Sequence, residues 1–171
     1  HSIKALTLSL VFSGFYPAKV AAGLFVLVGV LFLFRFFLWS PRVGFKKFEI
    51  GIMYLGYFAI GTHFLLEALR LLDMLSVVGD ISTHLFTFLA MGVIVSGMLT
   101  RISMGHTGRK LLFAASDKFA ISCMIAASIA RIILPQFDLA SYSFWITVSS
   151  FGWILCFGIL GLRLAPFLFQ A

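Results

Sequence analysis

The sequence predicts an all-α fold, a polytopic bundle of transmembrane helices, and three observations support this prediction. Of the 171 residues, 61% are hydrophobic and only 11% are charged, whereas about a quarter of the residues in an average soluble domain are charged. The apolar residues form long runs, and about 20 such residues cross a bilayer as a helix. The chain has 15 Gly but only 4 Pro, which suits helices that pack closely in lipid. We therefore expect the lipid bilayer to be its principal partner.

Five complete spans joined by short loops are expected along the chain, after a partial N-terminal helix. The first apolar stretch, from Ile3 to Phe12, is too short to span and is interpreted as the end of a preceding helix. The first complete span opens after Pro17, and the last two are expected to end before Pro135 and Pro166, because proline interrupts a continuing helix. The chain is thus interpreted as one transmembrane region, a C-terminal fragment of a larger protein, with spans at approximately residues 18–39, 48–72, 81–104, 117–134 and 142–164.

The formal net charge of +7 is interpreted as an orientation signal. No phosphate-reading or base-stacking motif accompanies the basic residues, so no nucleic acid partner is expected. When the loops are assigned alternately to two faces, one face collects three basic residues, Lys19, Arg70 and Arg131. The other face collects nine: Arg35, Arg42, Lys46, Lys47, Arg101, Arg109, Lys110, Lys118 and Arg163. The positive-inside rule then places this second face and the C-terminus in the cytoplasm.

Two histidines inside the predicted spans, His63 and His84, are the first candidate cofactor ligands, because intramembrane ionisable residues are rare and often functional. They lie about 10 Å and about 6 Å below the outer ends of neighbouring antiparallel spans. Two imidazoles at nearly one level could bind haem iron or copper. Met91 follows His84 by seven residues, on the same face of an α-helix, and its thioether suits Cu(I). Alternatively, the histidines form interhelical hydrogen bonds and Met91 fills the core.

Charged side chains near these histidines allow two interpretations. Glu67 lies one turn after His63 and could orient its imidazole, whereas Arg70 and Arg131 could pair with haem propionates. Alternatively, they are solvated charges at helix ends that contribute little to stability. Deeper in the last two spans, two cysteines lie at similar depth and could be neighbours, as a thiolate pair for copper or as small apolar core residues: Cys123 and Cys156.

The cytoplasmic end of the third span carries the segment TRISMGHTGRK, from Thr100 to Lys110. His106 lies 22 residues after His84, about 33 Å along a helix, so the two cannot share a metal. A glycine-flanked polar loop with Arg101, His106 and Arg109 could present imidazole and guanidinium groups to an anion or a metal. The alternative is a glycine-capped helix end that carries inward-facing positive charge.

This part of the chain resembles the signature of the NnrS family, which reads roughly HxLTxGAxGxMxxGMMxRVxLGHTGR. The matching stretches are His84-Leu85-Phe86-Thr87, Ala90-Met91-Gly92, Gly97-Met98, Thr100-Arg101 and Gly105-His106-Thr107-Gly108-Arg109. Weaker similarity includes Leu55-Gly56-Tyr57 with Gly61, and the stretch from Trp153 to Ala165-Pro166. The resemblance implies that the chain forms the last five spans of a protein with about twelve, whose N-terminal helices would be partners of this region.

The resemblance implies a multi-pass protein of the bacterial inner membrane that contains haem b and copper. NnrS proteins are associated with denitrification, the nitric oxide response and resistance to nitrosative stress. The residues it marks as cofactor-binding are His84, Arg101, His106 and Arg109. Where many members have a histidine before the Leu-Gly-Tyr of the second span, this chain has Tyr54, and His63 lies outside the family pattern.

Three functions are therefore weighed. The first is a haem and copper protein of the NnrS type; the resemblance does not decide whether such a protein turns over nitric oxide, passes electrons to a partner or protects metal pools. The second is a transporter or channel component whose His and Arg residues line a polar path. The third is a cofactor-free structural subunit in which the histidines serve only helix–helix hydrogen bonds.

Overall fold

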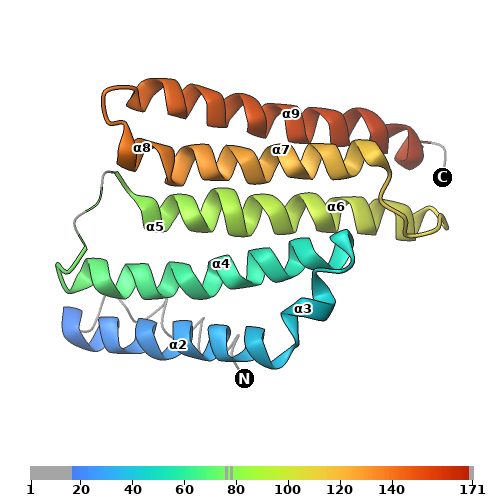
Figure 1. Cartoon of the computed structure of the whole chain (residues 1–171). Coiled ribbons are helices and arrows are strands. Elements are labelled where there is room, and N and C mark those ends of the chain that lie inside the picture. The colour runs from blue at the N-terminus through green and yellow to red at the C-terminus, as the bar shows by residue number, and fades with distance from the viewer. Residues whose placement is uncertain (1–16, 76, 78, 170–171) are drawn as a thin grey trace.

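The computed structural model describes residues 17–75, 77 and 79–169, and the regular structure within these ranges is entirely helical. Its main helices follow one another in chain order as antiparallel neighbours (Figure 1), and the last helix also packs against the third span. The predicted helical stub at residues 3–12 lies outside the described residues. Within the described residues, five helical stretches are long and apolar enough to cross a membrane: Ala18–Leu38, Phe48–Leu71, Ile81–His106, Ala115–Phe137 and Tyr142–Pro166. The predicted fold class is confirmed.

The first two spans are joined by a short helix, in the order α2 (Ala18–Leu38), α3 (Pro41–Gly44) and α4 (Phe48–Leu71). Ser40 has a φ of 55°, a left-handed conformation that turns the chain before Pro41 opens α3. The hydroxyl of Tyr54 in α4 donates a hydrogen bond to the carbonyl of Trp39 at 2.5 Å. Tyr54 therefore holds the turn against α4.

The third span changes its helical type along its length: α5 (Ile81–His84), the π-helix η1 (Leu85–Gly92) and α6 (Val93–His106). Asp80 caps its start, because its carboxylate accepts the Thr83 amide at 3.1 Å and the Thr83 hydroxyl at 2.6 Å. The span was predicted as uniform α-helix ending near residue 104, and the π-helical part is a difference. The helix ends later, at His106, where a glycine turn follows.

The last two spans are α7 (Ala115–Ile132), continued by the short α8 (Leu134–Phe137), and α9 (Tyr142–Phe169). Both prolines that were expected to end these spans lie within helix instead. Pro135 occupies the first turn of α8, where a missing N–H does no harm. Pro166 lies inside α9, three residues before its end. Helical structure therefore continues past both predicted ends.

Close helix contacts form the core. A Cβ atom added to Gly56 of α4 would lie 2.3 Å from Cγ1 of Ile94, and one added to Gly97 would lie 2.6 Å from Cδ1 of Ile52. Only glycine permits this approach of α4 to the third span. On the other side of that span, α7 and α9 complete a buried apolar cluster that includes Val93, Ile121, Met124, Cys156, Leu160 and Leu164.

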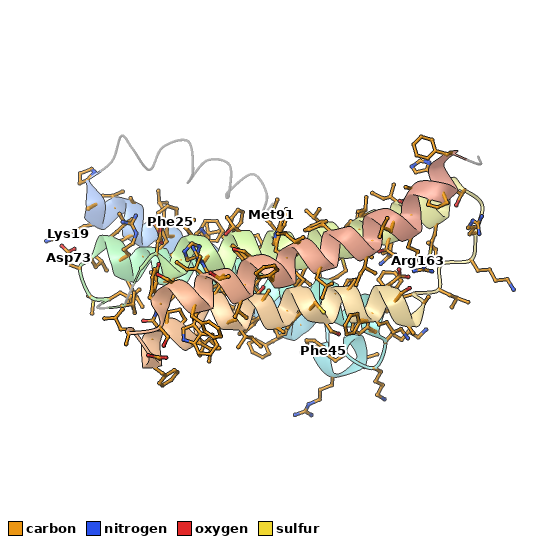
Figure 2. The ribbon with its side chains drawn as sticks, turned by 90° about the horizontal axis from the view of Figure 1, so that it is seen from above. Lys19, Phe25, Phe45, Asp73, Met91 and Arg163 are labelled. Carbon is orange, nitrogen blue, oxygen red and sulfur yellow. The ribbon has the colours of Figure 1, made fainter. Side chains whose placement is uncertain are left out.

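The loops separate into two ends of the bundle, as alternation of the spans predicts. The segment at residues 107–114 shares one end with α3 and with the end of α9, whereas α8 and the connection between α4 and α5 lie at the opposite end (Figure 1). Lys19 and Asp73 mark that opposite end and Arg163 lies toward the first (Figure 2). The end with α3 is called the basic end below, because it contains the nine basic residues counted above.

Candidate functional site

His84 is the last residue of α5, one turn inside the span that Asp80 caps. Its side chain is half-buried, and its ring lies 6.1 Å from the Phe88 ring at an interplanar angle of 88°. The guanidinium of Arg131, from α7, lies 5.8 Å from the centre of the same Phe88 ring. His84 interacts electrostatically with Arg131 and Asp80. The imidazole therefore lies on the α7 side of the third span, in a partly apolar setting with a nearby cation.

The π-helix begins directly after His84 and continues to Gly92. A π-helix is rare, and short π segments occur often at functional sites. Its hydrogen bonds join residues five apart, whereas those of an α-helix join residues four apart. Each turn of the π-helix therefore contains more residues than a turn of an α-helix. The seven-residue spacing that was expected to place Met91 below His84 on one face therefore does not apply here. Met91 is 45% exposed, on the outside of the described bundle (Figure 2).

His63, from α4, contacts a different side of the third span. Its Nδ1 atom lies 2.9 Å from both the carbonyl oxygen and the hydroxyl of Ser82. Its ring packs 4.9 Å from the ring of Phe86. Ser82 and Phe86 are four residues apart and share a helix face, whereas His84, two residues from each, lies on the other. The described contacts thus hold His63 by an interhelical hydrogen bond and do not bring its ring together with that of His84.

The acidic groups around these histidines are paired. Glu67 forms an ion pair with Arg70 one turn along α4, and it also interacts with Ser82 and His63. Hydrogen bonds from Thr83, first from its hydroxyl and then from its amide, hold the pKa of Asp80 below the usual value of an aspartate. Glu67 therefore forms an ion pair at the end of a helix, as one interpretation of the sequence proposed, and also lies near His63, as the other proposed.

At the basic end, the TRISMGHTGRK segment forms a glycine-capped helix terminus. Gly108 has a φ of 65°, its amide donates to the Gly105 carbonyl at 3.3 Å, and the Arg109 amide donates to the Met104 carbonyl at 3.0 Å. This pair of bonds is the Schellman motif. His106 is exposed in the last helical turn. The segment therefore has the glycine-capped helix end that was the second interpretation of the sequence, and the imidazole of His106 is exposed on it.

Arg101 and Arg109 are also exposed at this end. Arg101 precedes His106 by five residues, so the two side chains leave α6 on different faces, since neighbours on one face are three or four apart. Among residues 17–75, 77 and 79–169, no three His, Cys, Asp or Glu side chains gather as metal ligands.

One buried polar pair was missed by the sequence analysis. Asp117 in the first turn of α7 has a fully buried side chain and forms an ion pair with Arg163 of α9. Its other oxygen accepts the Ala114 amide at 3.0 Å. This span was predicted to begin at Asp117 itself, whereas the helix begins at Ala115 after the N-cap Ala114, so Asp117 occupies the third helical position, that of the acidic residue of a capping box. Nearby, Cys123 and Cys156 are free and interact with each other, as their similar depths predicted.

The comparisons with known proteins identify one family. The family model described as NnrS protein matches residues 2–171, nearly the whole chain. No curated protein and no solved structure matches the chain. The family match includes the region that carries His84, His106 and the glycine-capped end of α6.

Proposed function

Because this chain belongs to the NnrS family, we propose that it is a haem- and copper-binding, multi-pass protein of a bacterial inner membrane. Its role would lie in the nitric oxide response, denitrification or resistance to nitrosative stress. Five helices suited to crossing a membrane support the location. The excess of basic residues at one end supports a cytoplasmic position for that end and for the C-terminus.

The observation that carries the proposal is the position of His84. It belongs to the stretch that resembles the family signature, and it stands where α5 changes into the π-helix. Its side chain is half-buried, away from the contacts that hold His63. We therefore propose that His84 would hold the haem by binding its iron through the imidazole. Arg131, an electrostatic neighbour of His84, would be the cation that pairs with a propionate.

The described residues fit the two cofactors unequally. They fit a haem held by one imidazole, because a single nitrogen ligand from the protein is a known mode of haem binding. They do not form a closed copper centre, since no group of three His, Cys, Asp or Glu donors exists within the described ranges. Copper would therefore depend on one or two of the candidates His106, His63 and Met91. Bound haem would supply one-electron or nitric oxide chemistry; His84 would orient it, and Arg101 and Arg109 would supply positive charge at the basic end.

The test is an optical spectrum and a metal analysis of the full-length protein, purified in detergent. We expect a Soret band with redox-sensitive α bands, and copper above background. In His84→Ala the haem-to-protein ratio should fall about tenfold or more, because loss of even a second-sphere partner of a ligand costs this much. Far-UV circular dichroism must show unchanged helix content.

His63→Ala is the matched control for the haem-to-protein ratio alone, because that ring already contacts Ser82. It should retain haem while losing some stability. Colourless, metal-free wild-type protein with intact helices would refute the proposal and favour the cofactor-free alternatives. Retention of haem by His84→Ala would refute the assignment of the ligand.

A further inference from the structure

A cleft opens at the basic end, where the start of α4, the last turns of α6 and the segment at residues 107–114 meet. Its volume is about 410 Å³. Lys47 lies just before the first turn of α4, and Arg101 lies five residues before the end of α6. At 1.5 Å per residue, Arg101 is about 7 Å inside the helix end, a depth that matches the headgroup layer of a bilayer. In a bilayer whose surface coincides with the end of α6, the cleft would lie among the lipid headgroups.

The charge inside the cleft favours an anion. Lys47 and Arg101 line it together with a single carboxylate, that of Glu49. No hydrogen bond or ion pair formed among residues 17–75, 77 and 79–169 involves the side chains of Lys47 or Arg101. One net positive charge thus remains, in a site that also faces the N-terminal turn of a long helix. This balance matches the single negative charge of one phosphodiester.

The rest of the lining is apolar, which argues for a lipid over a free phosphate ion. Ile50, Leu111 and Leu112 contribute to the cleft and are 40%, 52% and 68% exposed. Two consecutive leucines in a non-helical connection are costly in water, because apolar surface in contact with water is unfavourable. Beside acyl chains the same side chains are favourably placed.

The wall of the cleft is held in place. Phe113 lines it, is only 6% exposed and belongs to the main core cluster. Its ring packs 6.4 Å from the ring of Phe48 at an interplanar angle of 63°. The connection that carries Leu111 and Leu112 is thus anchored to α4. A preformed site loses less conformational entropy on binding.

We propose that this cleft binds one anionic phospholipid, with its phosphodiester between Lys47 and Arg101 and its acyl chains against Ile50 and Leu112. The proposal is independent of haem and copper. Arg101 is also a candidate cofactor residue, so the lipid site is tested through Lys47 and Leu112, which the proposed cofactor sites do not use.

The experiment uses the full-length protein in nanodiscs of phosphatidylcholine with a minor fraction of phosphatidylglycerol. Native mass spectrometry then measures the enrichment of phosphatidylglycerol among the lipids that stay bound. Lys47→Gln should lower this enrichment about fivefold, the effect of one basic residue near an anionic lipid surface. Lys118→Gln is the matched control, an exposed lysine at the same end that does not line the cleft; it should change the enrichment less than twofold.

Two further arms separate a lipid from a free anion. Leu112→Ser should also lower the enrichment, and inorganic phosphate should not displace the bound phosphatidylglycerol. Equal effects of Lys47→Gln and Lys118→Gln would overturn the proposal, because diffuse surface charge would then explain the enrichment. Displacement by inorganic phosphate, or no effect of Leu112→Ser, would also overturn it, because the site would then bind the phosphate group alone.

Discussion

The ion pair between Asp117 and Arg163 joins the last two spans near the basic end, and its removal should weaken the bundle strongly. The Asp117 side chain is 0% exposed and that of Arg163 is 23% exposed. The Asp117 oxygen that faces Arg163 has no hydrogen bond of its own. Removing one partner of a buried pair costs about 3–5 kcal/mol, because the other charge is left without compensation. Since Arg163 is partly solvated, we expect the lower value, about 3 kcal/mol, for Arg163→Met.

A double-mutant cycle tests whether this loss comes from the stranded carboxylate. In Asp117→Asn combined with Arg163→Met no charge remains buried, so the double variant should be more stable than Arg163→Met alone. Lys118→Met, which removes an exposed charge one residue away, should stay within about 0.5 kcal/mol of the unchanged protein.

The assay is equilibrium unfolding in mixed micelles with increasing dodecyl sulfate, followed by far-UV circular dichroism. If Arg163→Met behaves like Lys118→Met, the ion pair makes no net contribution and the reasoning fails. It also fails if the double variant loses the sum of the two single losses, because the two side chains would then act independently.

Three more predictions concern helix ends and contacts. The fold lowers the pKa of Asp80, so the carboxylate stabilises the fold fully at a pH above its unfolded pKa of about 3.9, and this stabilisation is lost as the pH falls below that value. Asp80→Asn should therefore flatten the decline of the thermal unfolding midpoint between neutral and acid pH. An unchanged decline in the variant would contradict this prediction. Gly56→Ala should cost about 1–3 kcal/mol by overpacking against Ile94, and Ile94→Ala should restore part of the loss; additive losses would argue against this contact. At the end of α6, Gly108→Ala should lower the free energy of unfolding by about 1–2 kcal/mol, because the φ of Gly108 is 65°. Gly105→Ala should raise it by about 0.5–1 kcal/mol, because a Cβ atom there would meet nothing within 4 Å. Equal effects of the two substitutions in thermal unfolding would refute the assignment of the cap.

The spans could be predicted because lipid imposes a length and a composition on each helix. The first two end within one residue of the predicted positions, at Leu38 and Leu71. The later ends could not be predicted equally well, because a proline near a helix end removes only one donor. Pro135 and Pro166 both lie within helix for this reason.

The arrangement of the candidate site was harder to predict. Spacing along the chain fixed the depth of His63 and His84, but not the face of the helix on which each ring lies. The contact of His63 with Ser82 depends on how α4 packs against the third span. The π-helix after His84 has no signal in residue periodicity, so the expected alignment with Met91 was based on the wrong helix type. The partner of Asp117 is far away in sequence, so composition alone could not pair it with Arg163.

Helix packing explains some of the glycines in the stretch that resembles the NnrS signature, but not all of them. A Cβ atom on Gly92 would lie 2.8 Å from the sulfur of Met124, and Gly97 lets α4 approach. Gly105 is different, because a Cβ there would meet open space, and a helical glycine costs about 1 kcal/mol relative to alanine. His106, beside it, is exposed and imidazole contributes nothing to a glycine cap. Helix packing therefore explains Gly92 and Gly97, whereas the contacts among the described residues give no reason for the glycine at 105 or the histidine at 106.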